Sequence, residues 1–408
     1  MKRLLLCSLV LFSGLLFLFS SLFAEDANSV VDANNQFAFE LYARYKSSEE
    51  NIFFSPYSIS SALAMAYEGA EGTTADEIQA VFHFPKDDSL RREEFQRINN
   101  RINRKDKKYE LHIANALWAQ KDYLFLEEYF NLIENYYAGK VTNLDFVNET
   151  EKSRLSINNW VVEQTNNKIK GLIPSGVLGE LTRLVLTNAI YFKGAWFEQF
   201  GRKYTKEEDF RVSPGNIVKV QMMSLSGEEF NYAETEQVQV LELPYDGKEL
   251  SMLIFLPKND DLESVEASLN AQKLSEWKNS LKRERVDVYL PKFKFENKYF
   301  IKGTLKEMGM ATAFTLGIDF GGKADFSGMT GKKDLNIDEV IHQSFIAVNE
   351  EGTEAAAVTA VVIDVGAVWP PQPREIKIFK ADHPFIFIIE EKKTGNILFL
   401  GRVSDPNA

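Results

Sequence analysis

The side chains that most often perform catalysis are few in this chain and show no familiar catalytic spacing. Its four histidines lie in no sequence setting typical of a general base: His83, His112, His342 and His383. No Gly-x-Ser-x-Gly motif marks a serine nucleophile, and residues 328–333 lack both the spacing and the Ser or Thr of a phosphate-binding loop. No cluster of Cys and His predicts a metal site. The sequence therefore favours a protein that is not an enzyme and that needs neither metal nor cofactor.

Residues 350–365 carry the most informative pattern. In a strand, one face would be uncharged: Thr353, Ala355, Ala357, Thr359, Val361 and Ile363. Neither Pro nor Gly interrupts residues 353–365, although the run is much longer than the usual strand of about 5–6 residues. The Pro-rich stretch that follows cannot continue a central strand. The pattern fits an ordinary buried hairpin arm, or a segment that is a loop in one state and a strand in another.

Hydrophobic periodicity predicts the elements that would support this segment. Helices are expected over residues 58–68, 74–82, 91–104 and 150–168, and from Asp260 towards Leu281. Strands are expected over residues 184–192, 238–244, 250–257, 286–295, 385–390 and 397–403. Residues 184–192 are almost continuously apolar, as in a strand buried on both faces. The mixture predicts an α+β fold with large, mostly antiparallel sheets.

Composition narrows the class of protein and its partners. The net charge of −12 argues against nucleic acid and against an anionic membrane surface. No linker, low-complexity run or repeat divides the chain, so we expect one large domain over residues 25–408. Cys7 is the only cysteine and lies in the apolar N-terminal segment. The core, with 31 Phe in the chain, must therefore be stable without disulfides.

The N-terminal segment indicates export. A basic start at Lys2 and Arg3 precedes twenty uncharged residues, 4–23. We interpret residues 1–24 as a signal peptide. The mature chain would then be secreted, extracellular or periplasmic, without stable membrane association. Because the apolar run is long enough to span a bilayer, an uncleaved membrane anchor is the alternative.

Several motifs in a fixed order resemble the serpin family from about Asn35 to the C-terminus. Near the start and middle of the chain these are residues 51–59 (NIFFSPYSI), 186–196 (LTNAIYFKGAW), 325–329 (DFSGM) and 338–342 (DEVIH). Near the end, residues 379–389 (FKADHPFIFII) are similar to the family's C-terminal signature. Between them lies a segment that resembles the proximal hinge of inhibitory members: Glu350, Glu351, Gly352, Thr353, Glu354, Ala355, Ala356 and Ala357.

The resemblance implies a single domain of about nine helices around three β-sheets, with an exposed reactive-centre loop at about residues 350–373. Four positions match the shutter, where the main sheet parts: Ser55, Ser58, Asn188 and His342. Trp196 matches the breach, where insertion begins, and Lys292 matches the residue that pairs with the hinge acid Glu350. Ser, Asn and His suit a parting line because they exchange hydrogen-bond partners, and a buried unpaired group costs about 1–3 kcal/mol.

The implied function is suicide-substrate inhibition of serine, or alternatively cysteine, proteases. The protease forms an acyl-enzyme with the loop, and the freed hinge inserts into the main sheet before deacylation. The only partner expected is the target protease, held covalently by a monomeric inhibitor. A non-inhibitory carrier or chaperone of serpin fold is the alternative. The small hinge residues favour inhibition, because bulky, charged or Pro residues are typical of non-inhibitory members.

The family spacing places the scissile bond between Gly366 and Ala367, fourteen residues beyond Gly352. Two neighbouring bonds stay open as alternatives, Val365–Gly366 and Ala367–Val368. The stretch from Gly352 to Pro384 is a few residues longer than usual, and Gly is atypical before the cut. All three bonds are flanked by small or aliphatic residues. This bait predicts an elastase-like or subtilisin-like target rather than a trypsin-like one.

Overall fold

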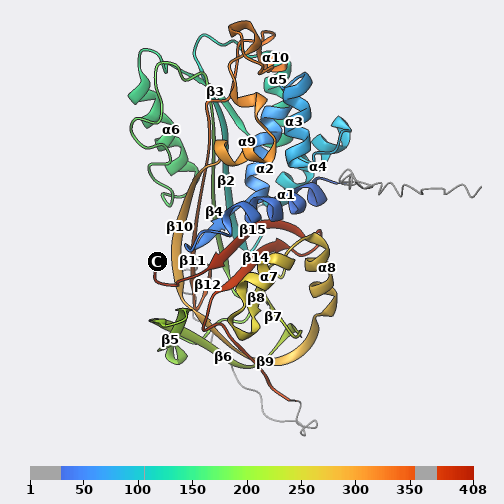
Figure 1. Cartoon of the computed structure of the whole chain (residues 1–408), viewed down its shortest axis with the longest axis vertical. Helices are drawn as coiled ribbons and strands as arrows, with labels where there is room; N and C mark the ends of the chain where they lie inside the picture. The colour runs from blue at the N-terminus through green and yellow to red at the C-terminus, as the bar shows by residue number, and fades with distance from the viewer. Residues whose placement is uncertain (1–28, 105, 354–374) are drawn as a thin grey trace, which may run out of the picture.

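The computed structural model describes residues 29–104, 106–353 and 375–408 (Figure 1). The predicted signal peptide, the hinge residues Glu354–Ala357 and the candidate bonds at 365–368 lie outside the described residues. Among the described residues, no helix combines the length and hydropathy that a membrane crossing requires.

Ten α-helices lie in the described part of the chain: α1 Val30–Tyr45, α2 Pro56–Tyr67, α3 Gly72–Phe82, α4 Asp88–Ile102, α5 Glu127–Leu132, α6 Thr150–Gln164, α7 Leu262–Ser268, α8 Ala271–Ser280, α9 Lys302–Met308 and α10 Ser327–Thr330. The Ser55 hydroxyl accepts a hydrogen bond from the Ser58 N–H at 3.2 Å, and Pro56 occupies the first position of α2. Both features favour a helix start.

The single helix predicted from Asp260 towards Leu281 is two helices in the structure. Leu269 has extended backbone dihedrals and ends α7. The Asn270 side chain then accepts from the Lys273 N–H at 2.8 Å and starts α8. Asn270 therefore divides an otherwise helical pattern into two helices. Its side chain accepts a hydrogen bond from a backbone N–H at the start of α8, which is the role of a residue that precedes a helix.

A six-stranded sheet positions the hinge. Its order is β10 (Phe293–Phe300), β11 (Glu339–Asn349), β12 (Gly352–Thr353), β4 (Leu184–Ala195), β2 (Tyr109–Gln120) and β3 (Lys140–Leu144). The pairs β4–β11 and β2–β3 are parallel, and the other neighbours are antiparallel. The strand predicted over residues 286–295 divides here, since β9 ends at Pro291 and β10 begins at Phe293.

The second sheet has nine strands: β1 (Ile52–Phe54), β15 (Asn396–Val403), β14 (Phe385–Glu391), β8 (Leu250–Pro257), β7 (Val238–Pro244), β6 (Asn216–Glu234), β9 (Lys282–Pro291) and β13 (Lys377–Lys380) in order, with β5 (Lys206–Ser213) on β6. A register shift between Leu225 and Glu228 divides β6. Its first part pairs with β5 and its last part with β7. The described residues thus form two sheets where three were expected, because β6 pairs with β9 on both sides of this shift and joins the two parts into one sheet.

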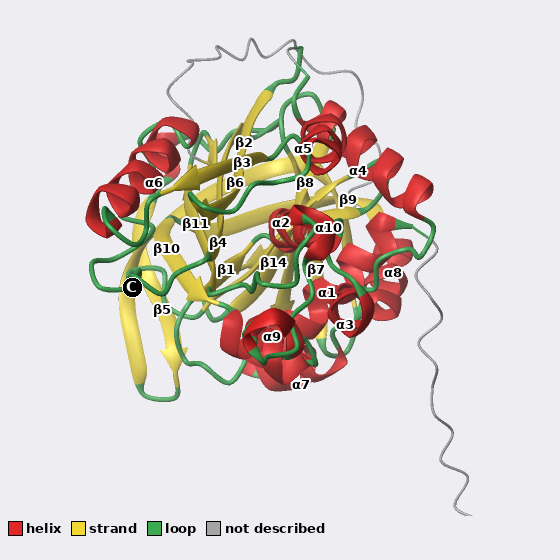
Figure 2. Cartoon of the chain, turned by 90° about the horizontal axis from the view of Figure 1, so that it is seen from above, coloured by secondary structure: helices red, strands yellow, loops and turns green. Residues whose placement is uncertain are grey.

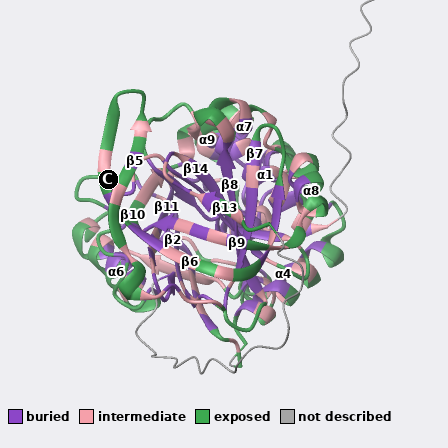
Figure 3. Ribbon diagram, turned by 90° about the horizontal axis from the view of Figure 1, so that it is seen from below, coloured by how far each residue is buried: buried purple, intermediate pink, exposed green. Residues whose placement is uncertain are grey.

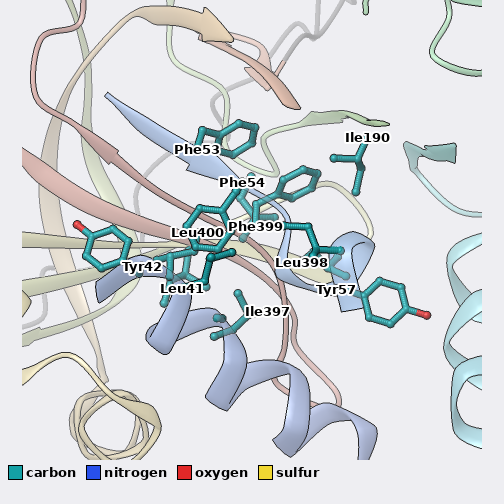
Figure 4. Packing of buried hydrophobic residues seen from close by; sticks show 14 of the residues in the cluster. Leu41, Tyr42, Phe53, Phe54, Tyr57, Ile190, Ile397, Leu398, Phe399 and Leu400 are labelled. Atoms are coloured by element: carbon teal, nitrogen blue, oxygen red, sulfur yellow. The ribbon is translucent and has the colours of Figure 1, made fainter. Parts of the chain in front are cut away.

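The main core lies between the two sheets and α1 and α2 (Figure 4). The Phe53 ring stacks on Phe399 with centroids 5.0 Å apart, and Leu41 and Tyr42 pack nearby. A smaller core lies under α6, where Ile157 and Val161 join buried residues of β2, β4 and β11. In Figures 2 and 3 most helices lie around the strands, although β5 and β10 also reach the edge, and most of the ribbon coloured as buried belongs to strands. The six-stranded sheet therefore has a core on each face.

Candidate functional site

The six-stranded sheet is closed at one end and parted at the other. Strands β4 and β11 pair directly, in parallel, from Val185 and Glu339 to Tyr191 and Phe345. Beyond this point β12 lies between them, antiparallel to both. Gly352 and Thr353, the first residues of the predicted inserting segment, already form a short strand inside the sheet (Figure 1).

The register of the two strands does not change where the sheet parts. In the closed part Glu339 pairs with Val185. In the parted part Val348 and Gly194 lie on either side of Thr353. The offsets 339 − 185 and 348 − 194 both equal 154. A strand inserted between β4 and β11 would therefore require them to move apart sideways but not to slide.

Gly352 lets the chain enter the sheet at close range. Its φ is +152°, a conformation that residues with a side chain rarely adopt. A Cβ at this position would lie 2.1 Å from the Gly194 carbonyl oxygen, well inside contact distance. Backbone conformation and backbone packing thus both require glycine here.

Thr353 is anchored by two aromatic residues, Tyr245 and Trp196, of which Trp196 was predicted to belong to the breach. Its side chain is buried, and its hydroxyl lies 2.7 Å from the Tyr245 hydroxyl. The Trp196 ring stacks on Tyr245 at 4.7 Å, and its indole N–H donates to the Asn349 carbonyl at 3.0 Å. The sequence did not identify Tyr245 as a site residue, because its local pattern predicted only a hairpin turn. Its role depends on contact with residues about a hundred positions away.

The two acids of the predicted hinge are held by cations and a hydroxyl. The Glu350 carboxylate is 3.0 Å from the Lys292 ammonium and accepts from the Thr205 hydroxyl at 2.8 Å. Burial raises the pKa of Glu350, but hydrogen bonds from the backbone, Lys292 and Thr205 outweigh it, so the pKa is lowered and the carboxylate stays ionised. Arg202 pairs with Glu351. Sequence reasoning named Lys292 but neither Thr205 nor Arg202.

The four predicted shutter residues meet in the closed part of the sheet. The Ser55 N–H donates to His342 Nε2 at 3.1 Å, so the imidazole proton is on Nδ1 and is donated to the Asn188 side-chain oxygen. The Asn188 amide donates to the Ser58 carbonyl at 2.8 Å. Burial lowers the pKa of His342 to about 3. The imidazole is therefore neutral, and Asn115, which also donates to the Ser58 carbonyl, completes the network.

Comparison with known proteins gives the class of this protein. The family model described as "Serpin (serine protease inhibitor)" matches residues 32–406. An uncharacterized serpin-like protein of Thermococcus kodakarensis is 44% identical over 378 residues, covering 92% of this chain and 86% of its own length. Leukocyte elastase inhibitor A of Rattus norvegicus is 40% identical over 384 residues, covering 92% and 98%. The chain belongs to the serpin family.

A solved structure shows the same architecture. The crystal structure of uncleaved ovalbumin has a TM-score of 0.82 and 32% sequence identity, and the match covers 93% of this chain and 100% of ovalbumin. The α+β serpin fold expected from the sequence is thus confirmed.

Proposed function

We propose that this protein is a suicide-substrate inhibitor of elastase-like or subtilisin-like proteases and not an enzyme. The observation that carries the proposal is β12, which occupies the gap between β4 and β11 with Gly352 and Thr353 of the predicted hinge. The similarity to leukocyte elastase inhibitor A supports an elastase-like target, as does the aliphatic bait around Gly366.

The register of β12 specifies where further residues would insert. Thr353 pairs with Gly194 and with Val348. Continued in the same register, residues 354–362 would run between β4 and β11 as far as Val185 and Glu339. The face of Thr353 would bring Ala355 between Phe192 and Ile346, which belong to the main core. Small residues at the leading positions let a strand enter this packed space with little displacement.

Insertion replaces one ladder with two. The direct β4–β11 pairing, seven residue pairs long, is lost, and the new strand pairs on both of its edges. The net gain is about one ladder of backbone hydrogen bonds at roughly 1 kcal/mol each, together with the burial of the apolar face. The uncleaved protein therefore stores free energy that a cut loop can release.

If the inserted strand keeps this register, Thr359 would lie level with the predicted shutter. Its partners would be Asn188 and His342, whose side chains are hydrogen-bonded to each other while the sheet is closed. Parting the strands breaks that bond. The Thr359 hydroxyl can accept from His342 Nδ1 and donate to the Asn188 oxygen, so both buried groups would stay paired.

The chemistry requires only the protease's own machinery. Its nucleophile attacks the carbonyl carbon of the residue before the scissile bond, for which we propose Gly366. The Ala367 amine leaves with the C-terminal part of the chain, and the carbonyl becomes an acyl-enzyme. Insertion of residues 354–362 then carries the acylated protease along the sheet before water can attack the ester. We further propose that residues 1–24 direct export and that the mature inhibitor is a monomer.

A panel of proteases tests the proposal. Incubation with elastase-like and subtilisin-like enzymes should give a covalent band that survives denaturing electrophoresis, with the mass of the protease plus the inhibitor minus its C-terminal fragment. Mass spectrometry of that released fragment should locate the cut between residues 365 and 368. Trypsin-like enzymes serve as the comparison. Complete loop cleavage by every enzyme of the panel, with no covalent adduct, would favour the carrier or chaperone alternative.

A further inference from the structure

A buried histidine joins separate segments at the end of the nine-stranded sheet. His383 lies in the turn between β13 and β14 and is 9% exposed. Its Nε2 atom is 2.7 Å from the carbonyl oxygen of Pro257, where β8 ends. Its Nδ1 atom is 2.8 Å from the carboxylate of Asp382. A backbone carbonyl and an ionised carboxylate can only accept hydrogen bonds, so both ring nitrogens face acceptors.

These two partners require a doubly protonated ring. Burial raises the pKa of Asp382, but the hydrogen bond and the charge of His383 outweigh burial and lower the pKa overall, so the carboxylate is ionised. A neutral imidazole has one N–H and can donate to Asp382 or to Pro257, but not to both. Burial lowers the pKa of His383, yet its two bonds outweigh burial and raise the pKa. The geometry therefore belongs to the imidazolium.

Charged groups of neighbouring elements surround the ring. The Asp260 carboxylate, in the loop between β8 and α7, is 3.8 Å from Nδ1 and 2.6 Å from the guanidinium of Arg211 on β5. Asn259 and Asp260 have φ of 59° and 58°, a left-handed conformation that residues with side chains rarely adopt. Histidine is the side-chain type whose charge ordinarily changes near neutral pH. The remaining charges at this junction have partners of their own: Lys258 with Glu234, and Lys380 with Glu208.

Few contacts attach strand β13 to the sheet. It has four residues, and among the described strands it pairs with β9 alone (Figure 3). In addition, the Gln239 side chain donates to the Ile378 carbonyl at 3.1 Å. The turn that follows β13 is held to β5 by the Arg211 N–H, which donates to the Asp382 carbonyl at 2.8 Å. The bond from His383 to Pro257 holds the same turn to β8.

We propose that His383 is a pH-sensitive latch that fastens the turn after β13 to the end of β8. The imidazolium holds Asp382 and Pro257 at the same time. When the ring loses one proton to solvent, the remaining N–H stays with the Asp382 carboxylate, because a hydrogen bond to a charged acceptor is the stronger one. The Nε2 lone pair then faces the Pro257 carbonyl oxygen, the two acceptors repel each other, and the turn separates from β8.

Opening of the latch would loosen β13. This strand is the first described strand after the predicted reactive-centre loop at about residues 350–373. The latch would therefore determine how firmly the C-terminal end of that loop is held, with firmer attachment in acid than in alkali. The inference goes beyond the proposed inhibition and does not depend on it, because the latch acts whether or not a protease is present.

Hydrogen exchange of the full chain, followed by mass spectrometry from pH 5.5 to pH 9, tests the latch. Protection is expressed relative to the intrinsic exchange rate at each pH. In the parent, we expect the protection of residues 377–383 to fall roughly tenfold as the pH rises, because a hydrogen bond with a charged donor is lost. Protection equal to that of residues 238–244 in β7 would show that the turn opens only when the whole protein unfolds, and would overturn the latch.

Two variants of the latch and one control make the test specific. In Asp382→Asn the side-chain amide can donate to Nδ1 while the Nε2 proton keeps the Pro257 bond, so the neutral ring satisfies both partners and protection should stay high at pH 9. In His383→Gln no imidazole remains at the junction, so the protection of residues 377–383 should not change with pH. The control His112→Gln removes a 40% exposed histidine from β2 and should follow the parent.

The other outcomes would contradict the latch. A parent profile without pH dependence would overturn it, as would the same fall in protection in His383→Gln. An Asp382→Asn protein that loses protection as the parent does would also overturn it, because the carboxylate would then not decide which bond is lost. If His383→Gln fails to fold, the parent and Asp382→Asn still decide the question.

Discussion

If the protein inhibits as we propose, replacing Thr353 with Arg should convert it from an inhibitor into a substrate. The Thr353 side chain is buried between Gly194 and Val348, and its hydroxyl is bonded to Tyr245. An arginine in that position would bury a positive charge where the parent has a neutral hydroxyl, and a buried charge without a counter-charge costs several kcal/mol. It would also leave the Tyr245 hydroxyl unpaired, at about 1–3 kcal/mol.

The protein can avoid this cost by leaving β12 out of the sheet. Such an exit forfeits only the few ladder bonds of a two-residue strand, roughly 2 kcal/mol in all. Before cleavage, loss of β12 from the sheet therefore costs less free energy than burial of the arginine. We expect Thr353→Arg to lower the free energy of unfolding only modestly. After cleavage the cost cannot be avoided by leaving the sheet, because the arginine must enter between β4 and β11 before the remaining residues can insert. A barrier increase of about 3 kcal/mol would slow insertion more than a hundredfold.

The assay is the stoichiometry of inhibition, together with the site and rate of loop cleavage. We expect Thr353→Arg to be cut at the same bond and at the same initial rate as the parent, with most cuts ending in released protease. Thr353→Ser keeps the hydroxyl and the small volume and should inhibit like the parent. If Thr353→Arg traps protease as efficiently as Thr353→Ser, the assignment of Thr353 as the leading inserted residue is wrong.

The structure also predicts the direction of three effects on folding stability, one at each of three residues. Burial lowers the pKa of His342 from 6.5 to about 3, so between these pH values the imidazole takes up a proton only in the unfolded chain. The free energy of unfolding should therefore fall by about 2 kcal/mol between pH 7 and pH 5. Urea titrations at the two pH values should show a smaller fall for His342→Gln. Burial lowers the pKa of His383, but hydrogen bonds to Asp382 and a backbone carbonyl outweigh burial and raise the pKa overall. The contribution of His383 to the free energy of unfolding is therefore complete below about pH 6.5 and is lost as the pH rises through the folded-state pKa. Removing this histidine should destabilise the protein more at pH 5.5 than at pH 9. Gly352→Ala should lower the free energy of unfolding by about 1–3 kcal/mol, because its Cβ would meet the Gly194 carbonyl in a disfavoured conformation; an unchanged melting temperature would show that β12 is not held in the sheet.

Strands with strong local patterns could be predicted from the sequence. The bounds of β7 and β8 agree with the predicted residues 238–244 and 250–257, because each is a short apolar run ended by Pro and joined by a turn at Gly247. The break between β9 and β10 was missed, since the alternation of side chains continues across it and only the pairing partner changes at Lys292. Helix α1 was also missed, because its apolar residues are diluted by buried asparagine such as Asn34.

The candidate site was predictable only in part. Motifs that resemble a family identified Trp196 and Lys292, which lie beside the hinge in the structure. Thr205, Arg202 and Tyr245 carry no local signal, since each contacts the hinge from 108 to 149 positions away in the chain. Such contacts depend on how the two sheets meet, which periodicity along one segment does not specify.

The central claim is that the gap between β4 and β11 can accept residues 354–362 as a strand. The most direct test is the melting temperature of the purified protein before and after a single nick between Val365 and Val368, with the two fragments left associated. The account predicts a large rise, because one ladder becomes two and an apolar face is buried. Cleaved Thr353→Arg should rise much less. An unchanged or lower melting temperature in the nicked parent would show that the segment does not insert, and would contradict the account.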